Sequence, residues 1–240
     1  MFSLLRLRLE KILYCLMHSG CWRALSLGVA PSLEHQAVIR SLKFDRLIDV
    51  GANRGQFSLL TRMEHPSVSI VAFEPIPHEA AKYRAIFGSD SRVTLKPHAL
   101  GSETGTANLH LSAQADSSSL LPISDLQQST FPGTNEVGTL TVKIERLDDV
   151  RDAWEDTTEA LMKIDVQGFE LEVLKGAKEA LKHCRFVYAE CSELPLYTGQ
   201  ALYHEVDAFL QTQGFAKRLA ANQQMRNGQL IQADYLFERK

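Results

Sequence analysis

From residue 46 onward, short runs of β-branched and other apolar residues alternate with stretches in which apolar residues recur every three to four positions. The short runs predict strands at Leu47–Val50, Ser69–Phe73, Val93–Lys96, Leu161–Val166 and Phe186–Glu190. The stretches between them predict helices over Gln56–Glu64, His78–Phe87 and Phe169–Lys182. This alternation is typical of βαβ units, and it predicts an α/β fold with a mostly parallel sheet.

The C-terminal part of the chain continues this pattern and then changes it. A helix is predicted over Tyr203–Gln213, and Gly214 follows it as a suitable C-terminal cap. Asn227–Gly228 then lies between two extended stretches, Arg218–Met225 and Gln229–Phe237, and this dipeptide is a strong signal for a two-residue hairpin. We therefore expect the otherwise parallel sheet to end in an antiparallel pair.

One segment, Ser112–Gly138, shows no clear period and is rich in Ser, Gln, Pro and Gly. Long irregular segments inside compact domains are usually functional or disordered. We expect this segment to cover a pocket; the alternative is a surface excursion without a function. The residues that follow it, Thr139–Ile144, are predicted to form a further strand.

The first 43 residues differ from the rest of the chain in charge. They contain six Lys or Arg residues and two acidic residues, whereas the whole chain has a net charge of −3. No apolar run here is long enough for a membrane span or a secretory signal. We therefore divide the chain into an N-terminal basic helical extension, residues 1–43, and a main domain, residues 44–240.

A stripe of apolar residues at helical spacing runs through this extension, and it contains Leu4, Leu5, Leu9, Ile12 and Leu16. Such stripes are mostly buried, so we favour a helix that packs on the body of the protein or on a partner chain, as in a dimer. The alternative is a basic amphipathic helix that lies on an anionic membrane surface.

The composition is that of a soluble globular protein. Hydrophobic residues make up 45% and charged residues 23% of the chain, which excludes disordered, collagen-like and disulfide-scaffold classes. The small negative net charge argues against a dedicated nucleic-acid binder. The four cysteines contain no C-x-x-C pair, so neither a disulfide framework nor a zinc cluster is indicated. We expect a cytoplasmic protein.

The segment Leu47–Phe57, with the sequence LIDVGANRGQF, predicts a strand, a glycine turn and the start of a helix. In doubly wound sheets this turn binds nucleotide-like ligands, and an acid at the end of the next strand, here Glu74, accepts hydrogen bonds from a ribose. Asp49 would repel a pyrophosphate but suits a ligand that carries an ammonium group. The glycine spacing also departs from the G-x-G-x-x-G of dinucleotide binders. These features favour S-adenosylmethionine over NAD.

Further motifs follow in order along the chain: FEP at residues 73–75, ALG at 99–101, KIDVQGFE at 163–170, LKGA at 174–177, and Glu190. With these motifs, the chain resembles the FkbM-type S-adenosylmethionine-dependent methyltransferases over roughly residues 45–238. The resemblance implies the class I methyltransferase (Rossmann-like) fold, a doubly wound seven-stranded sheet with a reversed C-terminal strand.

The resemblance also implies site residues for the cofactor. Asp49, Gly51, Asn53 and Gly55 would line the methionine end of S-adenosylmethionine, Glu74 and Pro75 the ribose, and Ala99 and Leu100 the adenine. Gln167 is a departure, because the family commonly has Glu at this position. If that acid is needed for chemistry, its loss predicts a binding module without activity.

Asp165 and Glu190 end two predicted strands on the same edge as the glycine turn. Two carboxylates there suit a general base for a hydroxyl acceptor or a clamp for a divalent metal ion. We favour the metal-free base, because two carboxylates are few ligands for a tightly held ion. For Glu190, a structural role in holding loops is the alternative.

We therefore expect an S-adenosylmethionine-dependent O-methyltransferase that acts on the hydroxyl of a small molecule, such as a sugar, a glycolipid headgroup or a polyketide-type metabolite. N-methylation of a small molecule or peptide is the second hypothesis, and a non-catalytic S-adenosylmethionine-binding module is the third.

Overall fold

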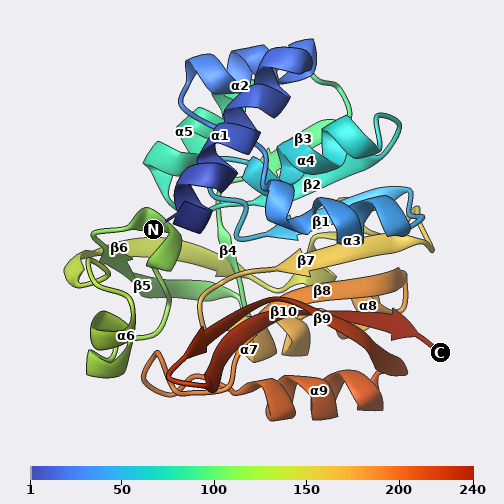
Figure 1. The fold of residues 1–240 in the computed structure, drawn as a ribbon. Coiled ribbons are helices and arrows are strands. Elements are labelled where there is room, and N and C mark those ends of the chain that lie inside the picture. Colours follow the sequence, from blue (N-terminus) through green and yellow to red (C-terminus); the bar gives the residue numbers. More distant parts are fainter. Residues whose placement is uncertain (1) are drawn as a thin grey trace.

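The structure is a computed structural model that describes the backbone of residues 2–240 and the side chains of residues 9–240. Figure 1 shows a central sheet with helices on both faces. Its seven strands lie in the order β3-β2-β1-β7-β8-β10-β9. Their bounds are Arg46–Val50 (β1), Ser69–Phe73 (β2), Val93–Lys96 (β3), Ala160–Ile164 (β7), Cys184–Ser192 (β8), Phe215–Arg226 (β9) and Gln229–Arg239 (β10).

Strand β10 runs against its neighbours. It pairs antiparallel with β8 and β9, whereas the other neighbouring strands of the sheet pair in parallel. Asn227 and Gly228 form the turn between β9 and β10, with φ of 51° and 78°, as a two-residue hairpin requires. The predicted class I methyltransferase fold with a reversed C-terminal strand is confirmed.

Helices bury both faces of this sheet (Figure 1). One face carries α3 (Gln36–Ser41), α4 (Gln56–Glu64) and α5 (Pro77–Phe87), and the other carries α7 (Glu170–Lys175), α8 (Lys178–Leu181) and α9 (Tyr203–Thr212). Every residue of the central strand β7 is therefore buried, and this explains its mostly apolar sequence, in which Lys163 is the one charged residue. Burying each large apolar side chain contributes roughly 1.5–3 kcal/mol, so the core fixes where the strand ends lie.

The single helix predicted over Phe169–Lys182 is wrong, because the chain forms two short helices there, α7 and α8. The N–H of Gly176 still donates to the carbonyl groups of Glu172 and Val173, but the next residue, Ala177, leaves the helical conformation with φ of −124° and ψ of 21°. Gly176 also lies so close to the carbonyl oxygen of Gly101 that any Cβ would collide with it. The tight contact with the chain after Leu100 thus interrupts a helix that the apolar spacing alone would continue.

A smaller sheet with the order β4-β6-β5 adjoins the site, and it consists of Ala99–Leu100 (β4), Gly105–Ser112 (β5) and Glu136–Glu145 (β6). Strand β6 contains the predicted strand, whereas β4 and β5 were not predicted. Between β5 and β6 lie the short helices η3 (Ala115–Ser117) and α6 (Asp125–Thr130). Two further short helices, η4 (Leu147–Asp149) and η5 (Arg151–Ala153), lead into β7.

The N-terminal segment forms α1 (Phe2–Met17), η1 (Ser19–Cys21), α2 (Trp22–Ser26) and η2 (Leu33–His35). Cys15, Cys21 and Ala24 pack in one apolar cluster with Leu59 of α4 and Phe87 of α5. Within residues 2–240, no helix is both long enough and apolar enough to cross a membrane.

We predicted that the apolar stripe of α1 packs on the body or on a partner chain. Packing on the body is wrong for the residues that can be tested, and packing on a partner chain stays a prediction. Leu9, Ile12 and Leu16 are 53%, 45% and 58% exposed. Leu4 and Leu5 lie outside the residues whose side chains are described. The reason is that α1 packs through its other face, on which Cys15 is fully buried.

Candidate active site

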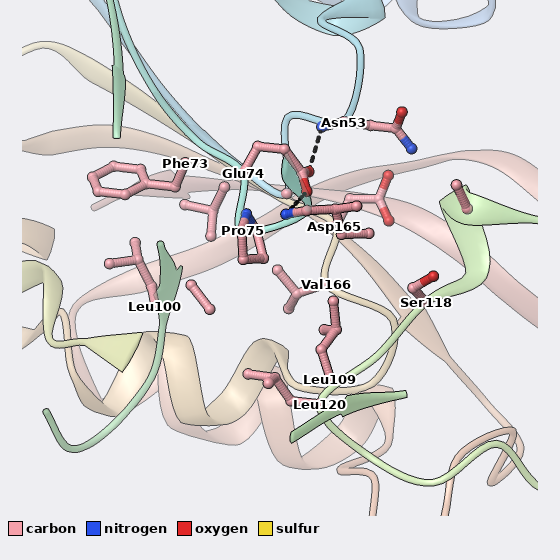
Figure 2. Close-up of a pocket in the computed structure, with 15 residues that line it drawn as sticks. Asn53, Phe73, Glu74, Pro75, Leu100, Leu109, Ser118, Leu120, Asp165 and Val166 are labelled. Carbon is pink, nitrogen blue, oxygen red and sulfur yellow. Dashed lines mark hydrogen bonds between the residues drawn. The ribbon is translucent and has the colours of Figure 1, made fainter. Parts of the chain in front are cut away.

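A cavity opens at the carboxyl ends of β1, β2 and β7 (Figure 2). The chain continues from β1 to β2 on one side, while β7 pairs on the other, so this is the switch point where doubly wound sheets bind ligands. The empty space, counted to its open mouth, is about 570 Å³. The residues that line it are Val50, Gly51, Asn53, Phe73, Glu74, Pro75, Ile76, Ala99, Leu100, Leu109, Ala115, Ser118, Leu120, Asp165 and Val166.

The glycine turn after β1 brings two strand ends into contact. Gly51 has a φ of 76°, a conformation that favours glycine. A Cβ at this position would also collide with the carbonyl oxygen of Asp165 at the end of β7. Asn53 has a φ of 48°, and the turn places its backbone N–H 2.8 Å from the Glu74 carboxylate. The turn therefore aligns main-chain groups of β1 with side chains from β2 and β7.

Glu74 is the buried acid of the cavity, with 4% of its surface exposed. Its two carboxylate oxygens each accept one backbone N–H, from Asn53 at 2.8 Å and from Ile76 at 2.7 Å, as the dashed lines in Figure 2 show. Burial raises the pKa of Glu74 to about 7, although these two N–H groups act in the opposite direction. Each oxygen retains a lone pair that can accept a hydrogen bond from a ligand hydroxyl.

The remaining wall of the cavity is mostly apolar. Leu100, Leu109, Leu120 and Val166 lie around one part of it, and Figure 2 shows these side chains below Pro75. Such a wall suits a flat, weakly polar ring system. Ala115, Ser118 and Leu120 belong to the irregular segment between β5 and β6, so the prediction that this segment covers a pocket is confirmed.

Two of the residues that sequence reasoning placed at the cofactor, Asp49 and Gly55, do not line this cavity. Asp49 is fully buried on the α4 side of the sheet, where it accepts a hydrogen bond of 2.6 Å from Ser58. Gly55 precedes α4, with a φ of 90°, and faces the rings of Tyr83 and Phe87. Both residues therefore lie behind the cavity wall. Asp49 faces α4 from β1, and Gly55, just before α4, faces the rings of α5.

Lys163 connects Asp49 with the cavity. Its ammonium group lies 3.5 Å from a carboxylate oxygen of Asp49 and 3.5 Å from one of Asp165, and it donates a hydrogen bond of 3.0 Å to the carbonyl of Gly51. Burial lowers the pKa of Lys163, but the two carboxylates outweigh burial and raise it overall. The charge that we expected Asp49 to offer a ligand is thus already balanced by Lys163.

Asp165 and Glu190, the two predicted acceptor-side carboxylates, are bridged by one amide. The Nε2 group of Gln167 donates to Asp165 at 2.9 Å and to Glu190 at 2.8 Å. Gln167 has a φ of 55°, and its Oε1 lies 2.9 Å from the hydroxyl of Tyr197. The hydroxyl of Ser119 donates to its carbonyl at 2.6 Å. Tyr197 and the two acids therefore hold the side chain of Gln167, and Ser119 holds its backbone carbonyl.

The two carboxylates have different surroundings. Asp165 lines the cavity and its side chain is 39% exposed. Glu190 lies on β8. Besides the hydrogen bond from Gln167, it accepts one of 2.9 Å from Gln232 of β10. Burial, followed by the nearby charges of Asp165 and Asp234, raises the pKa of Glu190 well above its usual value. The pair thus combines an accessible carboxylate with a buried neighbour whose pKa is raised.

Sequence reasoning identified Gln167 only as a departure from a pattern and missed its position between the two acids. No periodicity predicts this contact, because the partners Ser119, Tyr197 and Glu190 come from distant segments. Glu170 lies in the first turn of α7. It accepts N–H groups from Val166 and Gly168 and so holds the loop that carries Gln167.

Comparisons with known proteins show the family of this chain. The model of the methyltransferase FkbM domain matches residues 49–217. The 2-O-methyltransferase NoeI of Sinorhizobium fredii is 30% identical over 161 residues, which are 64% of this chain and 66% of that protein. The 31-O-demethyl-FK506 methyltransferase FkbM of Streptomyces tacrolimicus is 31% identical over 199 residues, which are 71% of this chain and 72% of that protein.

Among solved structures, fibrillarin of Aeropyrum pernix with bound S-adenosyl-L-methionine is similar at a TM-score of 0.48 and 8% identity, over 84% of this chain and 72% of that one. The family match covers both the glycine turn and the segment with Asp165 and Glu190. The chain therefore belongs to the FkbM family of S-adenosylmethionine-dependent methyltransferases.

Proposed function

We propose that this protein transfers a methyl group from S-adenosylmethionine to a hydroxyl of a small molecule, such as a sugar, a glycolipid headgroup or a polyketide-type metabolite. The observation that carries the proposal is the carboxylate pair Asp165 and Glu190, which Gln167 bridges beside the cavity. The names of two relatives, a 2-O-methyltransferase and a 31-O-demethyl-FK506 methyltransferase, also favour oxygen as the acceptor.

The residues that line the cavity fit S-adenosylmethionine. The buried carboxylate of Glu74 has free lone pairs for the two ribose hydroxyls, and Pro75 lies beside it. Ala99 and Leu100 belong to the apolar wall, which suits the adenine ring. Gly51 and Asn53 form the turn that would border the methionine end.

Asp49 and Gly55 contribute to this cofactor site indirectly in our proposal. Asp49 fixes Lys163, whose ammonium group holds the Gly51 carbonyl. Gly55 allows α4 to start close to the rings of α5. Both residues thus fix the shape of the turn without touching the ligand.

The acceptor chemistry follows from the accessible carboxylate. When bound, S-adenosylmethionine supplies a methyl group on a positively charged sulfur, which leaves with the electron pair of the broken C–S bond. Asp165 accepts the proton of the acceptor hydroxyl as the new C–O bond forms. Glu190 fixes the orientation of Asp165 through Gln167, and the in-line alignment of the two reactants supplies a large part of the rate.

We propose that this step needs no metal ion. Among the residues that the structure describes, no group of three or more His, Cys, Asp or Glu side chains is arranged to hold one, and hard divalent ions prefer six or more oxygen ligands. Turnover should therefore continue in the presence of a chelator. If the chelator abolished turnover and added Mg²⁺ restored it, the carboxylate pair would hold a metal ion and would not act as a metal-free base.

The proposal is tested with Asp165→Asn, which keeps the size of the side chain but removes its basicity. Formation of S-adenosylhomocysteine, measured with a panel of hydroxylated acceptors, should fall by about 10²-fold or more, the usual contribution of a positioned base. Binding of S-adenosylhomocysteine, measured by calorimetry, should stay within a few-fold of the wild type. Asp149→Asn, at a residue whose side chain is 54% exposed, is the matched control. Near-normal turnover by Asp165→Asn would refute the assignment of the base.

A further inference from the structure

Large hydrophobic side chains that face solvent gather in one segment. Among the side chains that the structure describes, ten large hydrophobic ones are exposed, and seven of these lie within residues 9–27: Leu9, Ile12, Leu13, Leu16, Met17, Trp22 and Leu27. We call these seven residues the N-terminal apolar patch. Patches of this kind on soluble proteins mark interaction sites.

Five residues of the patch share one face of α1. At 3.6 residues per turn, Leu9, Ile12, Leu13, Leu16 and Met17 fall within an arc of roughly 140°. In Figure 1, α1 and α2 lie on the side of the molecule that carries α4 and α5, and α2 is at the top. The apolar face of α1 is therefore a coherent surface and not a set of scattered residues.

The opposite face of α1 is already occupied. Cys15 is fully buried, the hydroxyl of Tyr14 donates to Glu64 at 3.1 Å, and the ammonium group of Lys11 donates to Glu34 at 3.1 Å. A rotation of α1 that buried the apolar patch would break all three contacts. The body of the protein thus fixes α1 with this patch outward.

The charge of the segment indicates what covers the patch. Residues 1–27 contain four basic residues, Arg6, Arg8, Lys11 and Arg23, and one acidic residue, Glu10, although the whole chain has a net charge of −3. A second copy that docked on the same patch by two-fold symmetry would bring like charges together. An anionic bilayer complements both the apolar face and the positive charge.

The patch also contains Trp22, which is 59% exposed. Tryptophan is enriched at the boundary between water and lipid, because its indole is apolar but carries an N–H group. α1 has 16 residues, fewer than the ~20 that a membrane-spanning helix needs. The segment therefore has the length and composition of a helix that lies in the plane of a membrane surface.

We infer that α1 and α2 dock this protein on the surface of an anionic lipid bilayer, with the N-terminal apolar patch inserted at the level of the headgroups. This inference rests on surface side chains and charge, and it does not depend on the identity of the methyl acceptor.

The test is co-sedimentation of the full-length protein with vesicles made of equal parts phosphatidylserine and phosphatidylcholine. The wild type should sediment with these vesicles, and more weakly with vesicles of phosphatidylcholine alone. Leu13→Ser/Leu16→Ser should reduce the partition coefficient by at least about tenfold, because two side chains no longer enter the lipid. Both residues are more than half exposed, at 57% and 58%, so the double variant should fold normally.

The matched control is Val137→Ser/Met225→Ser, at residues that are 61% and 56% exposed but lie outside the patch. This variant should bind vesicles like the wild type. Absence of wild-type binding to the anionic vesicles would overturn the inference, and so would equal binding by Leu13→Ser/Leu16→Ser. A wild-type dimer in sedimentation velocity that this variant dissociates, without any vesicle binding, would assign the patch to a second copy instead.

Discussion

The two halves of the candidate active site are built in different ways. The cofactor half uses main-chain groups and one acid from two consecutive strands, with Gly51 and Asn53 after β1 and Glu74 after β2. The acceptor half uses side chains that β7, β8 and a distant loop bring together around Gln167. The first half depends on a local turn, whereas the second depends on the packing of the whole sheet.

This difference matters because the two halves meet at one point. The Gly51 turn touches the carbonyl of Asp165 and accepts a hydrogen bond from Lys163. Substitutions in either half should affect binding or turnover selectively, and a substitution at the junction should affect both.

The largest effect is expected at this junction, for Gly51→Ala. The added Cβ collides with the Asp165 carbonyl, and a φ of 76° is unfavourable for alanine. Because a displacement of about 1 Å can cost about 10²-fold in rate, we expect both the affinity for S-adenosylhomocysteine and the turnover to fall by about 10²-fold or more. Calorimetry and an activity assay would measure the two effects.

Gly28→Ala is the control for backbone strain. Gly28 has a φ of 72°, but a Cβ there would meet no other atom within 4 Å. This variant should lose about 1–3 kcal/mol of stability and keep both its affinity for S-adenosylhomocysteine and its turnover. If Gly51→Ala impaired one half only, the two halves would not be coupled through this turn.

A smaller and more selective effect is expected from Glu74→Gln. Losing a charged hydrogen bond costs about 1.5–3 kcal/mol, so binding of S-adenosylhomocysteine at about pH 8 should weaken by roughly ten- to a hundredfold. Burial raises the pKa of Glu74 to about 7, so its carboxylate predominates above this pH and is lost as the pH falls through it. Wild-type affinity should therefore be about tenfold lower at about pH 6 than at about pH 8.

The variant supplies the control for this pH dependence. Glu74→Gln cannot titrate at this position, so its weaker affinity should change little between the same two pH values. A wild-type affinity that stays constant across this range would exclude Glu74 as the group that binds the ribose.

The smallest effect is expected from Gln167→Glu, which restores the residue common in the family. A third carboxyl group next to Asp165 and Glu190 raises their pKa values by like-charge repulsion. The acid limb of the pH–rate profile should shift to higher pH, and turnover near neutral pH should fall several-fold. Affinity for S-adenosylhomocysteine should not change, because Gln167 does not line the cavity.

Gln128→Glu, at an exposed residue of α6, makes the same change of charge away from the pair. It should leave the pH–rate profile in place. Equal profiles for wild type and Gln167→Glu would show that Gln167 does not influence the base.

Much of the fold could be predicted from the sequence. The strands Ser69–Phe73 and Val93–Lys96 and the helix Gln56–Glu64 have the predicted bounds, because each is a regular apolar pattern with clear ends. The reversed hairpin was equally clear, since Asn227–Gly228 suits only a few turn conformations. The sequence also placed Gly51, Asn53 and Glu74 at the cavity, because each follows a predicted strand, but it placed Asp49 and Gly55 there as well, and these two do not line it.

The tertiary structure decided what depends on contacts between distant segments. The contact between Gly101 and Gly176 interrupts the helix predicted over Phe169–Lys182, and the spacing of apolar residues does not predict that contact. Asp49 is fully buried on the α4 side of the sheet and pairs with Lys163, so a residue that was predicted to contact the ligand lies behind the cavity wall. The sequence likewise showed that α1 is amphipathic, but only its packing through Cys15 decided which face remains outward.

Contacts between distant segments also decided the arrangement of the acceptor half. Asp165 follows β7 directly, as predicted, whereas β8 continues beyond Glu190 to Ser192. The sequence by itself placed both carboxylates near the ligand edge, because strands can be read from local pattern. It did not determine that one amide, Gln167, bridges them, because that bridge requires β7, β8 and the loops with Ser119 and Tyr197 to pack around a residue with positive φ. Local pattern specifies which groups reach an edge of the sheet, and the packing of the sheet specifies which of them touch.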